Sequence, residues 1–232
     1  MDKFTAVIPA AGQGRRMKSY LNKQFILLRG MPIIVHTLRV FQDAEVISNI
    51  VLVCASGEEE YYRQEILSNY GISKPTVVVA GGSERQDSVC CGLQTINDSS
   101  DYVMIHDGAR PLLTVDLINR LAEEAKVTGA VVAGVPVKDT IKRTDAGGMI
   151  TDTLMRERLW SIQTPQVFSL ELIQKAHKQA SAAEFFGTDD AALVERLGVP
   201  VRVIPGSYEN IKITTPEDIV VAEAILKRRG LG

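Results

Sequence analysis

FTAVIPAAGQGRR, residues 4–16, joins a run of apolar residues to a loop of small and basic residues. The run Phe4–Ile8 is almost continuously apolar, which is typical of a strand that is covered on both faces in a parallel sheet. Small residues after such a strand let a ligand approach the backbone, whose N–H groups can then face an anion. The cations Arg15, Arg16 and Lys23 follow. The stretch therefore predicts an α/β sheet with an anion site at the end of its first strand.

Two common nucleotide-binding loops do not fit this stretch. The dinucleotide fingerprint G-x-G-x-x-G needs a third glycine where Met17 stands, and no acidic residue closes a second strand about 20 residues later. The phosphate loop G-x-x-x-x-G-K-[ST] fails because no Gly-Lys-Ser/Thr follows. The cations favour a triphosphate over a dinucleotide. From this loop alone, the alternative interpretation, a tight turn with a solvated basic face and no ligand, stays open.

The pattern of a buried strand recurs along the chain, and helical patterns separate its copies. The further strands are expected at Ile50–Ala55, Thr76–Ala80, Tyr102–Ile105 and Ala130–Val135, with helical apolar stripes at Ile34, Leu38 and Phe41 and at Val89, Leu93 and Ile96. Thr114 is expected to cap one helix and Gly129 to end it. Alternating strands and helices predict one domain over residues 1–232, built on an open, mostly parallel sheet flanked by helices.

The alternation of buried strands and helices stops after Pro136. In residues 137–154 apolar and polar residues alternate on either side of Asp145-Ala146-Gly147-Gly148, which is a hairpin signature. We expect a projecting β-arm at about residues 138–155. Because a two-stranded ribbon alone in water is marginally stable, a partner subunit is expected to cover it, although a floppy surface hairpin stays open.

The last third of the chain returns to the α/β pattern. Thr188 is expected to cap a helix over TDDAALVERLG, and strands are expected at Val201–Ile204 and Asn210–Ile213. Thr215, followed by Pro216, predicts the start of a final helix that ends before Gly230.

Bulk composition excludes several classes of protein. The 26 Lys and Arg against 28 Asp and Glu give a formal charge of −2, so no positive field attracts nucleic acid or a membrane surface. No apolar run reaches the length of a membrane span, and the N-terminal run is too short for a signal-peptide core. Three cysteines, at 54, 90 and 91, are read as small apolar residues rather than a disulfide or metal framework. We expect a cytoplasmic protein.

Two more clusters follow predicted strands. In GGSERQDS, residues 81–88, glycines such as Gly82 allow close backbone approach and Ser88 is a donor near the next helix; an ordinary capped turn is an equal alternative.

In HDGARP, residues 106–111, Asp107 stands at a strand end, where open α/β sheets bind ligands. Magnesium needs one or two carboxylates with phosphate oxygens and waters, so Asp107 alone is a candidate ligand. His106 is read as a packing residue.

These motifs, taken in order, resemble the 2-C-methyl-D-erythritol 4-phosphate cytidylyltransferase family over residues 7 to about 223. The motifs are PAAGQGRRM, NKQ, GGSERQDSV, HDGARP, PVKDTIKR, QTPQVF, TDDA and NIKIT. The resemblance implies a Rossmann-like nucleotidyltransferase fold. It also implies a homodimer joined through the arm, and Mg²⁺-assisted transfer of a cytidylyl group from CTP to methylerythritol phosphate with release of pyrophosphate.

The resemblance also assigns roles to residues. The catalytic cations match Arg16 and Lys23, and the metal carboxylate matches Asp107. The nucleotide-binding positions match Ala10, Ala11, Gly12, Gly82, Ser88 and Lys212. The positions that hold the acceptor phosphate match Arg110, Thr140, Arg156, Thr164, Thr188 and Lys212, and Arg156 is implied to reach the site of the other subunit.

This sequence departs from the family pattern in three places. Ser83 stands where Asp is frequent, Asn22 precedes the catalytic Lys where Pro is common, and Gly108 replaces Ala. Several alternative functions stay open. The acceptor could be ribitol 5-phosphate, the donor could carry another base, and a nucleotide-binding sensor could share the fold. A sensor would not need the catalytic cations Arg16 and Lys23 or the carboxylate Asp107. Because the sequence has all three, it favours an enzyme.

Overall fold

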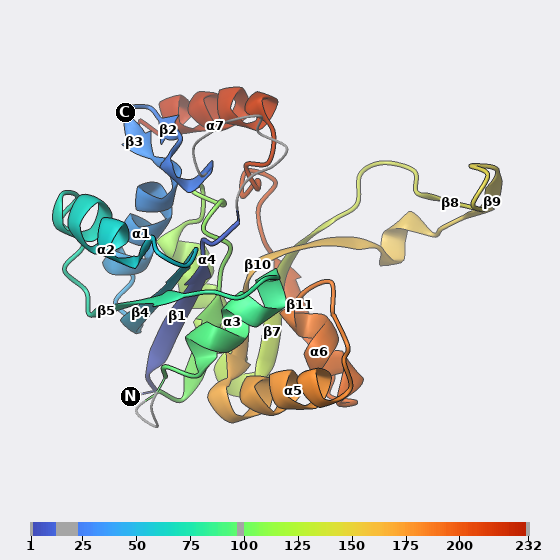
Figure 1. Cartoon of the computed structure of the whole chain (residues 1–232). Helices are drawn as coiled ribbons and strands as arrows, with labels where there is room; N and C mark the ends of the chain where they lie inside the picture. The colour runs from blue at the N-terminus through green and yellow to red at the C-terminus, as the bar shows by residue number, and fades with distance from the viewer. Residues whose placement is uncertain (1, 13–22, 97–99, 231–232) are drawn as a thin grey trace.

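A computed structural model of the chain describes residues 2–12, 23–96 and 100–230. Within these ranges, seven strands form a central sheet in the order β11-β7-β10-β6-β1-β4-β5 (Figure 1). Their bounds are β1 Phe4–Pro9, β4 Ile47–Cys54, β5 Thr76–Ala80, β6 Tyr102–Ile105, β7 Ala130–Pro136, β10 Trp160–Ser169 and β11 Arg202–Pro205. The other paired segments are β2 Leu27–Leu28 with β3 Met31–Pro32, and β8 Lys142–Thr144 with β9 Ile150–Thr153.

The sheet is mostly parallel, as predicted. The strand β10 is antiparallel to its neighbours β6 and β7, and the other neighbouring pairs are parallel. All five strands expected in the first 135 residues are present, with ends shifted by at most a few residues. The expected strand at Val201–Ile204 is found as β11.

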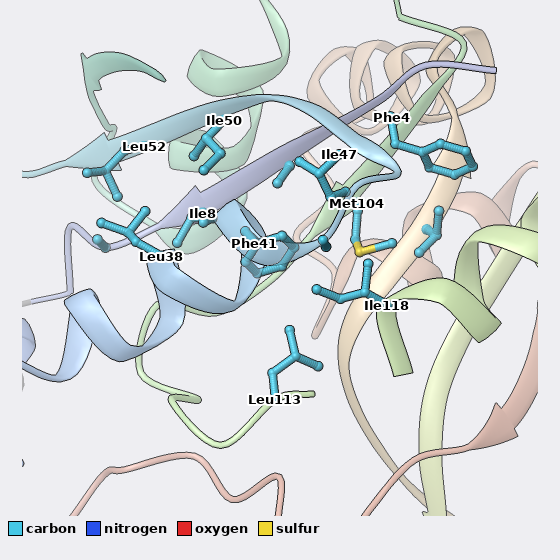
Figure 2. Close-up of a cluster of buried hydrophobic side chains, with 14 of the residues drawn as sticks. Phe4, Ile8, Leu38, Phe41, Ile47, Ile50, Leu52, Met104, Leu113 and Ile118 are labelled. Carbon is cyan, nitrogen blue, oxygen red and sulfur yellow. The ribbon is translucent and has the colours of Figure 1, made fainter. Parts of the chain in front are cut away.

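Helices cover both faces of the sheet. The helices are α1 Ile33–Asp43, α2 Glu59–Tyr61, α3 Arg85–Leu93, α4 Val115–Thr128, α5 Leu170–Ala182, α6 Asp190–Arg196 and α7 Pro216–Arg228, with 3-10 helices at η2 Lys23–Phe25 and η4 Arg156–Arg158 and a π-helix at η3 Tyr62–Ser68. Successive residues of β1 point to opposite faces, so Ile8 packs with the side chains of α1 and α4, while Val7 packs with those of α3 and α5. Figure 2 shows the first of these clusters, in which Leu38 and Phe41 of α1 lie against strand residues such as Ile8.

Most of the expected helix ends are confirmed. Thr114 caps α4 by accepting a hydrogen bond from Leu117 N at 3.3 Å, and Gly129 ends it with a φ of 71°. Thr215 begins α7 with a capping box, and Pro216 is its first residue. The cap expected at Thr188 is wrong, because Asp189 caps α6 and accepts from Ala192 N at 3.0 Å.

The strand expected at Asn210–Ile213 is also wrong. The segment has no strand partner in the described chain; instead Ile213 N donates to Ala109 O at 2.8 Å, and the buried Asn210 side chain donates to Thr164 O at 2.8 Å. Its apolar residues pack on α7 rather than on the sheet. The alternating pattern therefore reflects a covered loop, and this loop holds Lys212 beside the residues that follow β6.

A hairpin leaves the body of the molecule between β7 and β10 (Figure 1). Its strands β8 and β9 are exposed throughout. Asp145 closes the turn, since its side chain accepts hydrogen bonds from Gly147 N and Met149 N, both at 2.9 Å. Met149 and Ile150 are 70% and 64% exposed. A hairpin is therefore present at the predicted place, and the apolar side chains near its turn are exposed among the described residues.

The order of the strands creates a crevice at one edge of the sheet. The chain adds β4 and then β5 on one side of β1 and then crosses to place β6 on the other side. Open α/β sheets bind ligands at such a switch point, outside the carboxyl ends of the strands. Among the described helices, none is long and apolar enough to cross a bilayer.

Candidate functional site

A cavity of about 160 Å³ opens at this switch point. It is lined by residues that follow β1, β5 and β6, by the start of α3, and by one residue of the loop before α7. The full set is Pro9, Ala11, Gly12, Gln24, Gly82, Ser83, Glu84, Arg85, Ser88, Asp107, Gly108, Ala109 and Lys212. The fold thus brings six of the predicted site residues together, from four separate stretches of sequence.

Backbone hydrogen bonds hold the loops around the cavity. Ala10 N donates to Val53 O at 2.7 Å and Gly81 N donates to Cys54 O at 2.8 Å, so the loops after β1 and β5 both continue the ladder on β4. Gly108 N donates to Pro9 O at 3.2 Å. These bonds fix the loops on neighbouring strand ends, where a ligand can contact their main chain.

Gly82 is required by close packing against α3. A Cβ atom at this position would clash with the Cβ of Asp87, which is part of the capping box of α3. Ser88 lies on the same helix and donates from Oγ to Glu84 O at 3.0 Å. A larger residue at 82 would therefore displace either the loop or the helix start that carries Ser88.

Asp107 is the central charged group of the cavity. Its Oδ1 accepts a hydrogen bond from Arg85 Nε at 2.8 Å, and its Oδ2 accepts from Lys212 Nζ at 2.6 Å. Burial by itself raises the pKa of Asp107, but the charges of Arg85 and Lys212 outweigh it and hold the pKa well below the ordinary value of a carboxyl group. The site therefore holds an ionised carboxylate in contact with the ammonium group of Lys212.

Arg85 joins the cavity to a second buried carboxylate. Its Nη1 donates to Asp190 Oδ2 at 2.7 Å, and Asp190 Oδ1 contacts His177 Nε2 at 3.2 Å. Burial raises the pKa of Asp190, yet the net shift is downward because Arg85 and His177 stabilise its charged form. Arg85, Asp190 and His177 were not predicted as site residues, because nothing local in the sequence indicates that their side chains meet.

Thr164 supports Asp107 from the neighbouring strand β10. Its Oγ1 accepts from Asp107 N at 3.0 Å and hydrogen bonds with His106 Nδ1 at 3.2 Å. His106 is fully buried, and burial lowers its pKa to about 4. Its neutral ring packs against Phe41, as expected for a packing residue.

Arg110 lies behind the same loop. Its Nη1 donates to Asn210 O at 2.7 Å, while its buried Nε has no hydrogen-bond partner in the described chain. Burial lowers the pKa of Arg110. The guanidinium thus has an unused donor, and it binds the same residue, Asn210, whose side chain donates to Thr164 O.

Other predicted residues do not line the cavity. Thr140 and Arg156 lie at the base of the arm and are exposed, with Arg156 Nη1 donating to Lys138 O at 2.8 Å. Thr188 is exposed just before α6, and Ala10 is buried beneath the first loop. Arg16 lies outside the described residues. Lys23 begins η2, next to the cavity residue Gln24, and its side chain is not among those described.

The donor set around the cavity fits a magnesium ion that arrives with a polyphosphate. Among the described residues, no group of three His, Cys, Asp or Glu side chains is arranged to hold a metal by itself. Magnesium in phosphate-transfer sites uses one or two carboxylates and takes its remaining ligands from phosphates and waters. Asp107 offers such a carboxylate, and in this structure its two oxygens accept hydrogen bonds from Arg85 and Lys212.

Comparisons with known proteins point to a single family. The family model described as 2-C-methyl-D-erythritol 4-phosphate cytidylyltransferase matches residues 4–228. A protein of that name from Pelotomaculum thermopropionicum is 48% identical over 99% of this chain and 96% of its own length. Another, from Bacillus velezensis, is 50% identical over 97% of this chain and 96% of its own. The crystal structure of 4-diphosphocytidyl-2C-methyl-D-erythritol synthase from Anaerococcus prevotii superposes with a TM-score of 0.87 at 33% identity, covering 98% of this chain and 97% of that one.

Proposed function

The chain belongs to the 2-C-methyl-D-erythritol 4-phosphate cytidylyltransferase family, and we propose that the cavity beside Asp107 is the place where it joins CTP to methylerythritol phosphate. The products are 4-diphosphocytidyl-2-C-methyl-D-erythritol and pyrophosphate, and the pathway is isoprenoid biosynthesis. The observation that carries the assignment of the site is the ion pair of Asp107 with Lys212 at a strand switch point, between two glycine-containing loops.

The chemistry is an in-line attack of a substrate phosphate oxygen on the α-phosphorus of CTP. Both reactants are anions, so the barrier is dominated by their repulsion and by charge that builds on the non-bridging oxygens. Catalysis therefore consists of positioning and electrostatic stabilisation, and the phosphate needs no general base because it is already ionised. The N–H groups of Ala11 and Gly12 are proposed to face the triphosphate, because the N–H of Ala10 is already bonded to Val53 O.

Cations complete this arrangement. Arg16 is proposed to offer a planar donor fork to phosphate oxygens, and Lys23 a point charge. Each contributes about 3–4 kcal/mol of transition-state stabilisation, by analogy with lost oxyanion donors. Lys212, now on Asp107, is proposed to turn to phosphate when the ligands bind. Mg²⁺, held by Asp107, would neutralise phosphate charge when it is bound.

The acceptor phosphate is proposed to bind on the other side of Asp107. Arg110 and Thr164 approach it from the body of the subunit, with Thr188 from the loop before α6. The residues Thr140 and Arg156 lie on either side of the hairpin in the sequence and do not line the cavity of their own subunit. We therefore propose a homodimer in which the exposed apolar side chains of the arm pack on the partner and Arg156 enters the partner's site. The reactants are small soluble metabolites, and we propose that the enzyme works in the cytoplasm.

The experiment that tests this function measures pyrophosphate release for every pairing of CTP, UTP or ATP with methylerythritol 4-phosphate or ribitol 5-phosphate. We expect rapid release only from CTP with methylerythritol 4-phosphate. Equal or faster release with ribitol 5-phosphate would contradict the acceptor, and equal release from UTP would contradict the base preference.

A further inference from the structure

Arg85 shares one guanidinium group between two carboxylates that come from different elements. Nε donates to Asp107 Oδ1 at 2.8 Å, in the cavity, and Nη1 donates to Asp190 Oδ2 at 2.7 Å, at the start of α6. Nη2 is buried and has no hydrogen-bond partner among the described residues. One buried donor is therefore unused although an ionised carboxylate lies next to it.

This unused donor matters because of the geometry of guanidinium groups. Arginine usually binds a carboxylate through a fork of two parallel N–H···O bonds, and Nε and Nη2 lie on one edge of the group. A complete fork on Asp107 would occupy both of its oxygens. Here Nε holds Oδ1 alone, and Oδ2 is left to Lys212 at 2.6 Å. The incomplete fork therefore keeps one oxygen of Asp107 for a cation in the cavity.

Asp190 is the group that holds Arg85 in this orientation. It is 1% exposed, and its second oxygen contacts His177 Nε2 at 3.2 Å. The start of α6 is itself fixed, because Gln166 Nε2 donates to Asp189 Oδ2 at 2.7 Å and Gln166 Oε1 accepts from Ala191 N at 3.0 Å. Asp190 thus offers a fixed acceptor that keeps Nη1, and with it the guanidinium plane, turned away from a fork on Asp107.

The turn before α6 is bound to α3 by the residue next to Arg85. Gln86 Nε2 donates to Phe185 O at 3.0 Å, and Gln86 Oε1 accepts from Gly187 N at 2.9 Å. Asp190 and Arg85 are therefore held on two elements that are tied together at an adjacent point. This tie fixes the separation between Arg85 and Asp190.

We propose that Asp190 is a positioning residue that acts through Arg85 to keep one oxygen of Asp107 available to a divalent cation. The inference rests on the proposed function, because the cation in question is the one that accompanies CTP. With Asp190 neutral, Arg85 is free to close its fork on Asp107. The local set of two cations and two carboxylates also gains a net positive charge. Both effects weaken the binding of a divalent cation at Asp107.

The test measures the affinity for CTP by calorimetry, with saturating Mg²⁺ and with EDTA, in the absence of acceptor so that no turnover occurs. In the parent protein Mg²⁺ is expected to strengthen CTP binding. We call the ratio of the CTP affinity with Mg²⁺ to the CTP affinity with EDTA the Mg²⁺ gain. In Asp190→Asn, which keeps the shape of the side chain, we expect this gain to fall by about fivefold or more, which is in the usual range of couplings between two ligands. Asp189→Asn is the matched control: it weakens the cap of α6 and lowers the melting temperature but leaves the gain unchanged.

A second variant separates positioning from a purely structural role. In the double variant Arg85→Gln/Asp190→Asn no guanidinium remains to cover Asp107, so the Mg²⁺ gain is expected to recover toward the parent value although two buried charges are lost. A gain that is unaffected in Asp190→Asn, or that falls further in the double variant, would overturn the inference while leaving the proposed function intact. A parent protein that binds CTP without any gain from Mg²⁺ would contradict the metal assignment and the inference with it. A parent protein that does not bind CTP would contradict the proposed function itself.

Discussion

At the scale of single residues, the site depends on a carboxylate that is held between two cations. Asp107 was predicted from its place at a strand end, and Lys212 was implied by the family resemblance through the motif NIKIT. Their ion pair and the pairing of Arg85 with Asp190, 105 residues away, were not predicted. A periodic pattern indicates which face of an element is buried, but it does not indicate which charged groups meet once the elements pack.

Replacing Asp107 by Asn tests the carboxylate directly. The neutral amide cannot balance a divalent cation, so we expect kcat to fall by about 10²–10³-fold, the cost seen when one preorganised electrostatic contact to a transition state is lost. Steady-state pyrophosphate release measures it. Asp116→Asn is the control, because Asp116 is an exposed carboxylate that pairs with Arg120 on α4, and it should keep full activity. An Asp107→Asn variant with more than half of the parent kcat would refute the role.

At the scale of elements, strands with apolar residues throughout were predicted well and mixed segments were not. Thr76–Ala80 and Tyr102–Ile105 have the bounds that the sequence predicted. The strand β10 was not predicted, because its first three residues, from Trp160, are exposed and its buried part includes Gln163 and Gln166, whose polar side chains hydrogen bond to other loops. A pattern of hydrophobicity does not predict the burial of polar residues that have specific tertiary partners.

The start of α7 provides a prediction about pH. Asp218 Oδ2 accepts hydrogen bonds from Thr214 N at 2.7 Å and Thr215 N at 2.8 Å, which lie just beyond Lys212 and Ile213. Burial raises the pKa of Asp218, but these hydrogen bonds outweigh it and the net shift is downward. A lowered pKa means that the stabilisation is present above the unfolded-state pKa, about 3.9, and is lost as the pH falls through the lower folded-state value.

Asp218→Asn should therefore cost about 1 kcal/mol in free energy of unfolding at pH 7, the usual value of a helix cap. The difference from the parent should shrink as the pH falls below about 4, where the unfolded carboxyl becomes protonated. Urea unfolding at a series of pH values measures both quantities. A difference that stayed constant down to pH 2 would show that the charge of Asp218 is not what stabilises the cap.

At the scale of the whole molecule, two predicted site residues that do not line the cavity, Thr140 and Arg156, lie at the base of the arm. The hairpin was predicted from alternation around Asp145–Gly148, and it projects from the body as expected (Figure 1). Its residue Arg156 stays outside the cavity of its own subunit. Local turn chemistry was enough to predict the arm, whereas its contact with a second subunit is a proposal that a single chain does not test.

Mixing two variants with complementary defects, assayed at a methylerythritol phosphate concentration well below the Michaelis constant of Arg156→Ala, tests that proposal. Arg156→Ala is expected to raise the Michaelis constant for methylerythritol phosphate, and Asp107→Asn to lower kcat. If Arg156 acts in the partner's site, a mixed dimer has one site with both changes and one site with neither. Denaturing and refolding the two variants together should then restore about a quarter of the parent activity, because half of the dimers are mixed and each has one intact site. No recovery, with mixed dimers shown by mass spectrometry, would place Arg156 in its own subunit's site.

The most direct measurement is a crystal structure of the chain with CTP and Mn²⁺, with the metal located by its anomalous scattering. The account predicts a Mn²⁺ peak at coordination distance from Asp107 Oδ2, with Lys212 moved onto the phosphates and the triphosphate lying along the backbone of residues 10–12. A metal and a triphosphate bound elsewhere, with the contact between Lys212 and Asp107 still intact, would contradict it.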